Sequence, residues 1–412
     1  MNIPSEKILR EVYGDSHDNA ARFRLLCEKF CKTFSDKSPE FFTAPGRAEI
    51  IGNHTDHNGG QVIAASIDMD TVGAAFPNGT NTVHIFSQGY RPKIAVDLSH
   101  PEAAGKHQTT PPLVAGMMEA VRKFGFKVSG FDAYISSNVI RAAGVSSSAS
   151  FEMLVCTIVN HFFNDGAMSL TDYAKIGQYA ENVYWNKASG LMDQMACAVG
   201  GAVFLDFSDQ EKIGYKKMGL SFENAGYGIL LINTGKNHAD LSREYSEIPS
   251  EMRQIAAALG SNLLCDTDEE KLLSVFPDTG NDRALLRALH FFEENRRVNA
   301  AAKAIEKGNV PALMRLMERS GISSFEFLQN CYVTWDLRDQ KIPLVLALTR
   351  HFLDRIGDGI CRVHGGGFAG TIMCVLPKDR EQEYIKYISK YVGAKNVYPL
   401  KIRNTGAVHL PI

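Results

Sequence analysis

A segment of alternating apolar residues that leads through a loop of small residues into an apolar helix constrains the fold of this chain most. Phe131, Ala133 and Ile135 alternate with more polar residues, which predicts a half-buried strand. The loop RAAGVSSS follows, and apolar residues from Phe151 to Phe162 then recur at the i, i+3, i+4, i+7 spacing of one buried helix face. Strands and helices intermix in this way along the whole chain, so we expect an α/β or α+β protein.

The remaining elements are read from the same periodicities. Helices are expected at 5–34, 112–124, 251–259, 283–308, 311–320 and 341–356, and strands at 61–76, 81–87, 200–207 and 227–234. A strand, a glycine-rich loop, a second strand, a helix and a last strand close the chain. A polar stretch at 209–219 separates two of the strands, and a length of 412 residues favours two domains. We therefore place the boundary between 1–208 and 209–412.

Charge and cysteine content exclude several classes of protein. With 44 Lys+Arg against 46 Asp+Glu, the net charge of −2 argues against a nucleic-acid binder and a polybasic membrane-surface protein. The eight cysteines are spread singly without a C-x-x-C pair, which favours reduced thiols in the cytoplasm over a disulfide or zinc framework. The N-terminus lacks the apolar core of a signal peptide, and no apolar run has the length of a membrane helix. No protein partner is indicated.

The small-residue loop Ala142–Ser148 is a candidate anion site. Where a helix begins, the first backbone N–H groups have no partner in the helix, and they lie at the positive end of its dipole. The consecutive serines add hydroxyls that can bind phosphate oxygens or a metal ion. The loop is not a Walker loop, because G-x-x-x-x-G-K-[ST] occurs nowhere in the chain. An ordinary serine-rich helix cap is the alternative.

A second candidate loop, Pro45–Gly60, is dense in hydrogen-bonding side chains. Such a density suits a ligand with many hydroxyl groups. His54, Asp56 and His57 also allow a metal site, although zinc normally takes four ligands at recognised spacings. A solvated polar turn without a binding function is the alternative.

The third loop, Gly365–Gly370, formally matches G-x-G-x-x-G. A dinucleotide-binding loop must open a helix, whereas TIMCVL after this loop reads as a strand, so a close approach of backbones is favoured. Asp193 stands in an apolar, small-residue setting, and Glu181 lies twelve residues before it on an expected helix. Taken alone, Asp193 also suits a helix cap.

Together and in order, these segments resemble the galactokinases of the GHMP small-molecule kinase family. Residues 44–60, APGRAEIIGNHTDHNGG, are similar to the signature PGR-x-N-[LI]-I-G-E-H-T-D-Y-N-x-G, and 144–150, GVSSSAS, to the phosphate loop G-L-S-S-S-A-S. Residues 181–194 resemble the stretch that joins the metal-binding Glu to the catalytic Asp. Residues 233–245 resemble the segment that ends in a sugar-contacting Tyr, 289–298 a galactokinase helix, and 362–370 the third motif R-M-T-G-G-G-F-G-G.

The resemblance implies a two-domain α+β protein of mixed α/β layers, with a ferredoxin-like C-terminal domain and with ATP and sugar in the cleft between the domains. It implies ATP-dependent phosphorylation of galactose at O1 with Mg²⁺. Asp193 would be the base or an electrostatic partner of the anomeric hydroxyl, and Arg47 would lower its proton affinity. The implied phosphate loop is Gly144, Val145, Ser146, Ser147, Ser148 and Ala149. The implied Mg²⁺ ligands are Ser148 and Glu181, and the implied sugar contacts are Arg47, Asn53, His54, Asp56, Gly190, Asp193 and Tyr245.

The chain departs from the family pattern at several positions. Asn53 replaces the Glu that contacts the C6 hydroxyl of galactose in the family, and this loss of a carboxylate makes a 1-kinase for a sugar acid such as galacturonic acid the alternative substrate reading. A catalytically silent sugar and ATP sensor is the alternative from another class. His57 replaces a Tyr, and Gly is replaced at three positions, Ala142, Asn186 and Ala369. In addition, TPPL at 110–113 stands in place of a Trp-x-Asn-Tyr stretch. The last change predicts an altered nucleobase pocket.

Overall fold

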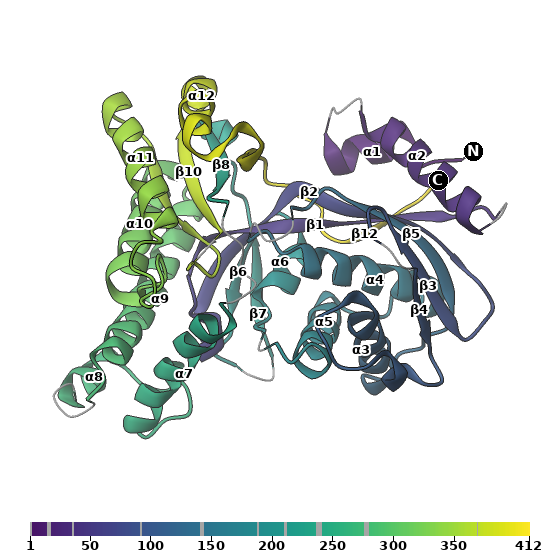
Figure 1. Ribbon diagram of the computed structural model, residues 1–412, viewed down its shortest axis with the longest axis horizontal. Helices are drawn as coiled ribbons and strands as arrows, with labels where there is room; N and C mark the ends of the chain where they lie inside the picture. Colours follow the sequence, from purple (N-terminus) through teal and green to yellow (C-terminus); the bar gives the residue numbers. More distant parts are fainter. Residues whose placement is uncertain are drawn as a thin grey trace.

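The strands form two sheets within the residues that the computed structural model describes, which are 2–14, 18–34, 37–90, 93–140, 144–187, 189–209, 212–235, 241–275, 280–368 and 370–412 (Figure 1). The larger sheet contains β1 (Glu40–Ile51), β2 (Gln61–Pro77), β3 (Thr82–Ser87), β4 (Ile94–Asp97), β5 (Phe131–Ser137), β6 (Ala202–Asp206), β7 (Gly214–Met218) and β12 (Val408–Leu410). The smaller sheet contains β8 (Tyr227–Asn233), β9 (Ile360–His364), β10 (Thr371–Pro377) and β11 (Val397–Leu400).

The helices fall into two groups that follow the two halves of the chain. The first group is α1 (Glu6–Tyr13), α2 (Asp18–Phe34), α3 (Thr110–Lys123), α4 (Ser147–Phe163), α5 (Leu170–Tyr184) and α6 (Met192–Val199). The second group is α7 (Ser242–Ala258), α8 (Glu269–Val275), α9 (Asp282–Glu306), α10 (Val310–Ser323), α11 (Lys341–Ile356) and α12 (Glu381–Val392). This mixture of helices with largely antiparallel sheets confirms the expected α+β class.

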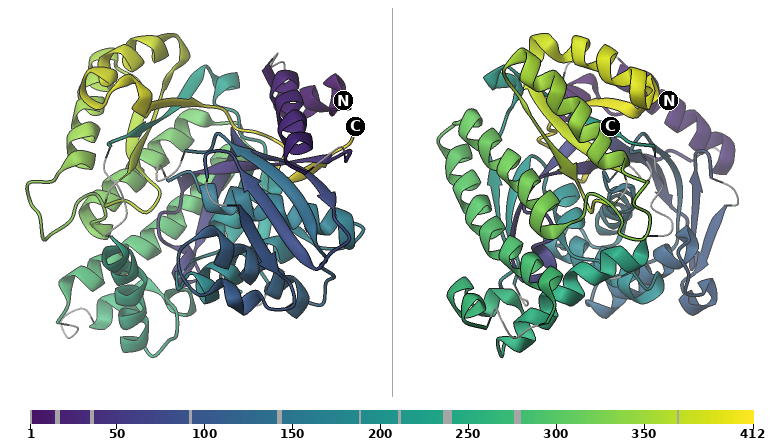
Figure 2. Two further views of the ribbon diagram at one scale, coloured as in Figure 1. Left: turned by 45° about the vertical axis from the view of Figure 1, so that its right-hand side comes forward. Right: turned by 60° about the vertical axis from the view of Figure 1, so that its left-hand side comes forward.

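The first strand shows how the larger sheet comes to lie between two layers of helices. Successive side chains of a strand point to opposite faces. Phe41 accordingly packs in the cluster of α1 and α2, whereas Phe42 packs in the cluster of α3, α4 and α5. Figures 1 and 2 show α1 and α2 on one side of the sheet and α3 to α6 on the other. Because both faces are covered, β1 is buried from Phe41 to Ile51 and shows no alternation of polar and apolar residues.

The larger sheet has the order β12-β1-β2-β5-β3-β4, and β6 joins the far part of β2 and pairs in turn with β7. Only the β3–β5 pair is parallel among the described strands of this sheet. Two strands from beyond residue 208, β7 and β12, therefore complete the sheet of the first half. The domain boundary at 208/209 stays a prediction.

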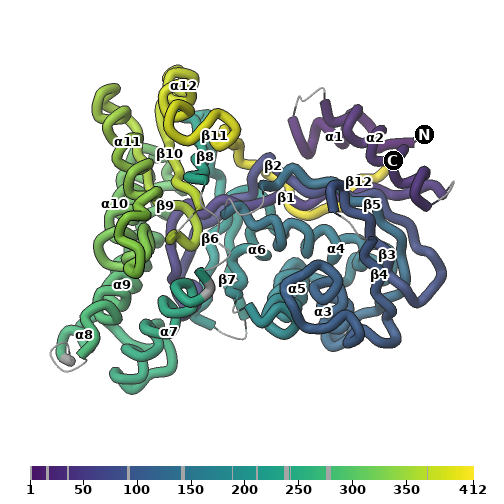
Figure 3. The backbone as a smooth tube through the Cα atoms, in the orientation of Figure 1, coloured from purple at the N-terminus to yellow at the C-terminus, as the bar shows by residue number. Residues whose placement is uncertain are grey.

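The two halves share one apolar core. The smaller sheet, with the order β11-β8-β10-β9, packs one face against α11 and α12. Its other face meets Ile50 and Ile63 of the larger sheet, and Val298 of α9 and Leu313 of α10 pack into the same cluster. Figure 3 shows the last residues crossing back from the smaller sheet to β1, so the two ends of the chain lie near each other.

Most of the expected helices and strands are confirmed, and four predictions are wrong. The helix expected at 5–34 is interrupted, because α1 ends at Tyr13 with Gly14 (φ 72°) as its C-cap and α2 begins at Asp18. Helix α4 is buried almost all round between Ala149 and Asn160, not on one face, because it lies between the sheet and other helices.

Residues 45–51 are not part of a loop, because β1 continues through them to Ile51. The polar stretch 209–219 is not only a connection, because it contains β7. All eight cysteines are free thiols, as expected. Among the described helices, none combines the length and apolarity that crossing a membrane requires.

Candidate functional site

Strand β1 brings Arg47 to the start of helix α4. The pairing of β1 with β2 is irregular between Pro45 and Arg47, which lets a proline lie within a central strand. The backbone N–H of Arg47 donates to Val145 O at 3.2 Å, and its guanidinium donates to Gly144 O. The predicted sugar signature and the predicted phosphate loop are therefore joined by direct hydrogen bonds.

Asp193, the second residue of α6, lies against both of these segments. Its Oδ1 accepts from Nε of Arg47 at 2.8 Å and lies 2.8 Å from Nη2, while its Oδ2 accepts from the Ser146 hydroxyl. Burial alone would raise the pKa of Asp193, but the charge and hydrogen bonds of Arg47 and the hydrogen bond of Ser146 hold it below its ordinary value. The side chain of Asp193 is 32% exposed, whereas that of Arg47 is 6% exposed. The ionised Asp193 carboxylate is thus held in one position and is accessible to solvent.

The start of α4 has the geometry of an anion site. Ser146 is the N-cap residue, with a left-handed backbone (φ 55°), and its hydroxyl makes no capping bond within the helix. Because that hydroxyl is committed to Asp193, the backbone N–H groups of the first turn have no side-chain cap. Ser146 is therefore not an ordinary helix cap, and phosphate binding by this loop stays a prediction. Arg141, Ala142 and Ala143 lie outside the described residues.

Ser148, the second residue of α4, lies beside Glu181 of α5. The Ser148 hydroxyl donates to Oε1 of Glu181 at 3.0 Å, and Nζ of Lys187 lies 2.8 Å from the same oxygen. Glu181 is 2% exposed, so the Lys187 ammonium compensates its buried charge. Asn186, just before Lys187, has φ 50°. Asn tolerates this left-handed conformation better than most residues, which explains how it can replace a glycine there.

Four of the residues predicted to bind sugar form a second group of contacts. We call this group, which consists of His54, Asp56, Gly190 and Tyr245, the wall. Gly190 faces Asp56 so closely that an added Cβ would collide with the Asp56 carboxylate. His54 donates from Nε2 to Gly366 O at 2.9 Å, and burial lowers its pKa to about 3, so the ring is neutral. The Tyr245 hydroxyl donates to Gly367 O at 2.8 Å.

The glycine loop between β9 and β10 forms the back of this wall. A Cβ on Gly366 would collide with the ring of Tyr245, and one on Gly367 would collide with the backbone oxygen of Asn330. The expected close approach of backbones is therefore confirmed, and the loop leads into strand β10 rather than a helix. Ala369 lies outside the described residues.

The side chain of Asn53 makes hydrogen bonds within the protein. Its side-chain amide donates to both carboxylate oxygens of Glu49 at 3.1 and 3.0 Å and to Gly365 O at 2.7 Å, and its Oδ1 accepts from Asn330 at 2.7 Å. Asn53 is 1% exposed. A direct contact between Asn53 and sugar stays a prediction, and the geometry shows instead a residue that fixes the glycine loop.

Sequence reasoning missed several members of this network. Glu49 makes a buried ion pair with Arg362, with Oε1 2.9 Å from Nη2. The quoted signature could have revealed Glu49, because that pattern has Asn at its position. Lys187 lies within residues 181–194, but the resemblance assigned it no role. Asn330 carried no signal, since it follows α10 in a stretch that resembles no motif.

Comparisons with known proteins agree with this geometry. Residues 28–77 match the family described as "Galactokinase galactose-binding signature", and residues 112–201 match "GHMP kinases N terminal domain". The galactokinase of Limosilactobacillus fermentum is 31% identical over 385 residues, which cover 90% of this chain and 95% of that protein. The chain belongs to the galactokinase family. Members of this family are sugar kinases, so the chain is a phosphotransferase and ATP is its phosphoryl donor.

One further sequence relative and two solved structures extend the comparison. The galactokinase of Clostridium tetani is 28% identical over 385 residues, which cover 92% of this chain and 95% of that protein. The crystal structure of Lactococcus lactis galactokinase complexed with galactose superposes with a TM-score of 0.81 at 26% identity and covers 94% of this chain and 99% of that one. The Methanococcus jannaschii mevalonate kinase, at 16% identity and a TM-score of 0.62 over 89% of this chain and 99% of that one, shares the fold.

Proposed function

We propose that this chain transfers the γ-phosphoryl group of ATP to O1 of galactose, giving galactose 1-phosphate and ADP. One observation carries the proposal: Asp193 is held on one oxygen by Arg47 and on the other by Ser146, at the start of the phosphate-loop helix. An acceptor hydroxyl bound to Asp193 would thereby lie next to the backbone N–H groups that we propose bind the phosphate oxygens.

Asp193 would accept the hydrogen bond of the anomeric hydroxyl and aim O1 at the phosphorus. Its low pKa makes it a weak base, so we propose that orientation precedes proton transfer and that the proton moves to Asp193 as the O–P bond forms. This order suits the loose transition state of phosphoryl transfer, in which the nucleophile gains little charge early. Arg47 would stabilise both the carboxylate and the charge on the transferred group.

Ser148 and Glu181 fit a magnesium ion, which prefers oxygen ligands and keeps several waters. The hydroxyl and carboxylate oxygens are already 3.0 Å apart, and Lys187 supplies the positive charge that the buried carboxylate requires in the absence of an ion. Bound Mg²⁺ would neutralise charge on the ATP phosphates. The backbone N–H groups of Ser147, Ser148 and Ala149 would hold phosphate oxygens.

The wall of His54, Asp56, Gly190 and Tyr245 would hold the sugar hydroxyls. Asp56 offers two acceptor oxygens, and neutral His54 keeps Nδ1 as an acceptor because Nε2–H is committed to Gly366. The carboxylate lost at Asn53 reappears in the adjacent Glu49, where Arg362 balances its charge, so the same buried network keeps one carboxylate. This removes the reason to expect a sugar acid.

The test is turnover by the purified chain with Mg·ATP and galactose, followed by ³¹P NMR for a sugar 1-phosphate. Galactose, glucose, talose and galacturonic acid form the panel, and galactose is expected to give the highest kcat/KM. Asp193→Ala should reduce kcat by about 10²–10⁴-fold or more while the circular dichroism spectrum is unchanged. Absence of a 1-phosphate product from galactose would refute the proposal, and near-normal turnover by Asp193→Ala would refute the role of Asp193.

We also propose that the enzyme acts in the cytoplasm. Eight free cysteines without a paired spacing support a reducing compartment, where both ATP and reduced thiols are available. Fractionation of the native host, with antibody detection of the chain, tests this location.

A further inference from the structure

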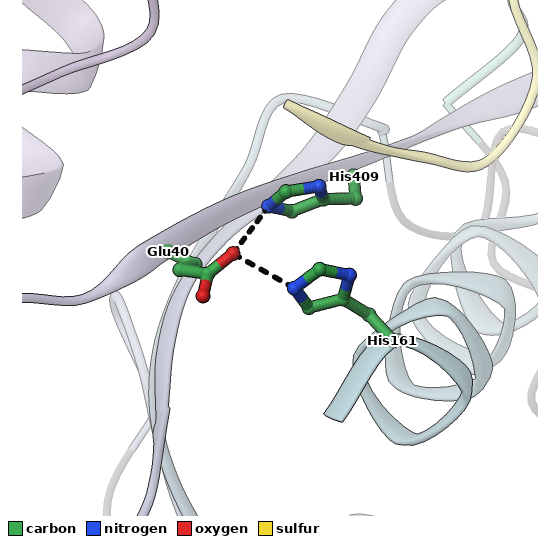
Figure 4. Close-up of side chains that lie close together, drawn as sticks. All are labelled: Glu40, His161 and His409. Atoms are coloured by element: carbon green, nitrogen blue, oxygen red, sulfur yellow. Dashed lines mark hydrogen bonds and ion pairs between the residues drawn. The ribbon is translucent and has the colours of Figure 1, made fainter. Parts of the chain in front are cut away.

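Three side chains from distant parts of the sequence converge at the outer end of the larger sheet. Glu40 and Phe42 lie on the same face of β1, because side chains alternate along a strand. His409 of β12 is paired with Phe42 in the antiparallel register and therefore points to that face as well. His161, near the end of α4, completes the group from the helix layer, and Figure 4 shows both imidazole rings directed at Glu40.

The three ligand atoms of this group share one small space. Oε2 of Glu40 lies 2.8 Å from Nε2 of His161 and 2.6 Å from Nε2 of His409. The two rings stack with centroids 3.8 Å apart and planes inclined by 19°. Phe42 packs against both rings. Among the described residues, this is the only group of three or more His, Cys, Asp or Glu side chains whose ligand atoms all lie within 4.8 Å of one another.

Two imidazole nitrogens and one carboxylate oxygen are a ligand set that zinc and related transition metals accept, with water in the remaining position. Magnesium and calcium prefer oxygen ligands, so this set discriminates against them. The side chains of Glu40, His161 and His409 are 40%, 32% and 23% exposed, which gives an ion and a water ligand access.

We propose that Glu40, His161 and His409 bind one divalent transition-metal ion of the zinc class. Around a tetrahedral ion with bonds of roughly 2.0–2.1 Å, ligand atoms stand about 3.3 Å apart. The two N–O separations must therefore widen by roughly 0.5–0.7 Å. The partly exposed Glu40 can rotate by this amount. The two stacked rings must also turn so that the Nε2 lone pair of each points at the ion.

The proposed site is separate from the catalytic centre. His161 and Ser148 lie at opposite ends of α4, thirteen residues apart, which is about 20 Å along the helix. An ion there would bind β12 to β1 and α4 at once. We therefore expect it to stabilise the chain without altering turnover, and the inference stands independently of the proposed sugar substrate.

Zinc binding by the full-length, metal-stripped protein tests the site, measured by competition with a chromophoric zinc chelator. One zinc ion per chain is expected, and His161→Ala, His409→Ala and Glu40→Gln should each weaken the Kd at least about tenfold, since even loss of an outer partner costs about 10–100-fold. His84→Ala is the matched control, because His84 is also partly exposed and pairs with one carboxylate, Asp132, at 3.0 Å. This control should bind zinc like the parent chain.

Cobalt(II) provides a readout that does not depend on stability. The parent chain and His84→Ala should give the intense visible absorption of a tetrahedral cobalt site, and the three ligand variants should lose it. Kinase turnover without added transition metal verifies that each variant is folded. The inference is overturned if the parent chain binds no zinc, or if folded His161→Ala and His409→Ala bind zinc as tightly as the control.

Discussion

Two side chains of the sugar signature have exchanged chemical identities relative to the family pattern. The pattern has Asn at the position of Glu49 and Glu at the position of Asn53, and the two residues here are joined by hydrogen bonds of 3.0 and 3.1 Å. The exchange keeps one carboxylate and one amide in the same buried network, with Arg362 as the counter-charge. Asn53 taken alone indicated that a carboxylate had been lost, because that inference did not consider that Glu49, four residues earlier, had gained one.

The exchange predicts strong coupling between the two positions. Glu49→Asn leaves the buried Arg362 without its ion pair, which should cost about 3–5 kcal/mol of unfolding free energy. Asn53→Glu places a second carboxylate against Glu49 and should cost about 3 kcal/mol. The double variant Glu49→Asn/Asn53→Glu should recover at least half of the summed loss, as measured by urea denaturation in a double-mutant cycle. Simple additivity of the two losses would contradict the paired role.

Arg47 sets the protonation of Asp193, and a pH profile can show it. Burial raises the pKa of Asp193, and the Arg47 charge brings it below the ordinary value of 3.8. In Arg47→Gln the opposing charge is gone, so the pKa of Asp193 should rise and its carboxylate form should be lost at a higher pH. The acid limb of kcat should therefore move upward in the variant, in addition to a general loss of rate. An acid limb at the parental pH in both proteins would count against this coupling.

At the scale of elements, the sequence predicted the helices and strands whose apolar residues recur with a clear period. Helices with apolar residues at helical spacing, such as α9 and α11, were recovered close to their bounds. Strand β1 was mistaken for a loop from Pro45 onward, because a strand buried on both faces has no alternation and its proline lies at an irregularity of pairing. Strand β12 is only three residues long, too short for a period of two to show.

The start of α4 supports a prediction about the phosphate loop. Ser146 combines a left-handed backbone with a hydrogen bond to Asp193, so Ala and Gly substitutions separate the two properties. Both variants should lose turnover by about 10- to 100-fold, because both lack the hydroxyl. Ser146→Gly should nonetheless be more stable than Ser146→Ala by about 1 kcal/mol, since glycine adopts φ 55° freely. Equal stabilities in thermal unfolding would show that the backbone there is not strained.

At the scale of the molecule, the site depends on contacts between segments some 300 residues apart. Asn53 and His54 from the first half bind carbonyl groups of the glycine loop in the second half. The resemblance supplied the list of site residues, but no pattern in one chain states which backbone atom faces which side chain. That information comes from the shared core, which fixes the two sheets against each other.

Asp70 is the buried charge that ties the ends of the chain to the larger sheet. Its carboxylate lies 2.6 Å from Arg22 of α2 and 2.9 Å from Arg403 near the C-terminus. Asp70→Asn should destabilise the protein by about 3–5 kcal/mol in urea, because Arg403 stays buried without its pair. Burial raises the pKa of Asp70, but the two arginines hold it below 3.8. The stabilisation by Asp70 is therefore complete above pH 3.8 and lost as pH falls through the lower, folded-state pKa. The difference between parent and variant should shrink below about pH 4, and a difference that persists there would contradict this assignment.

The pairing of β12 with β1 also has a consequence for synthesis. Residues 41–43 pair with residues 408–410, which form the strand that is synthesised after all the other described strands. Until then, a nascent chain that has already folded its first two hundred residues presents the outer edge of β1 without a partner. Open strand edges recruit other strands, so nascent chains are most vulnerable to aggregation during the interval in which the second half is translated. Strand β12 therefore covers this edge of β1 only after all the other described strands have been synthesised.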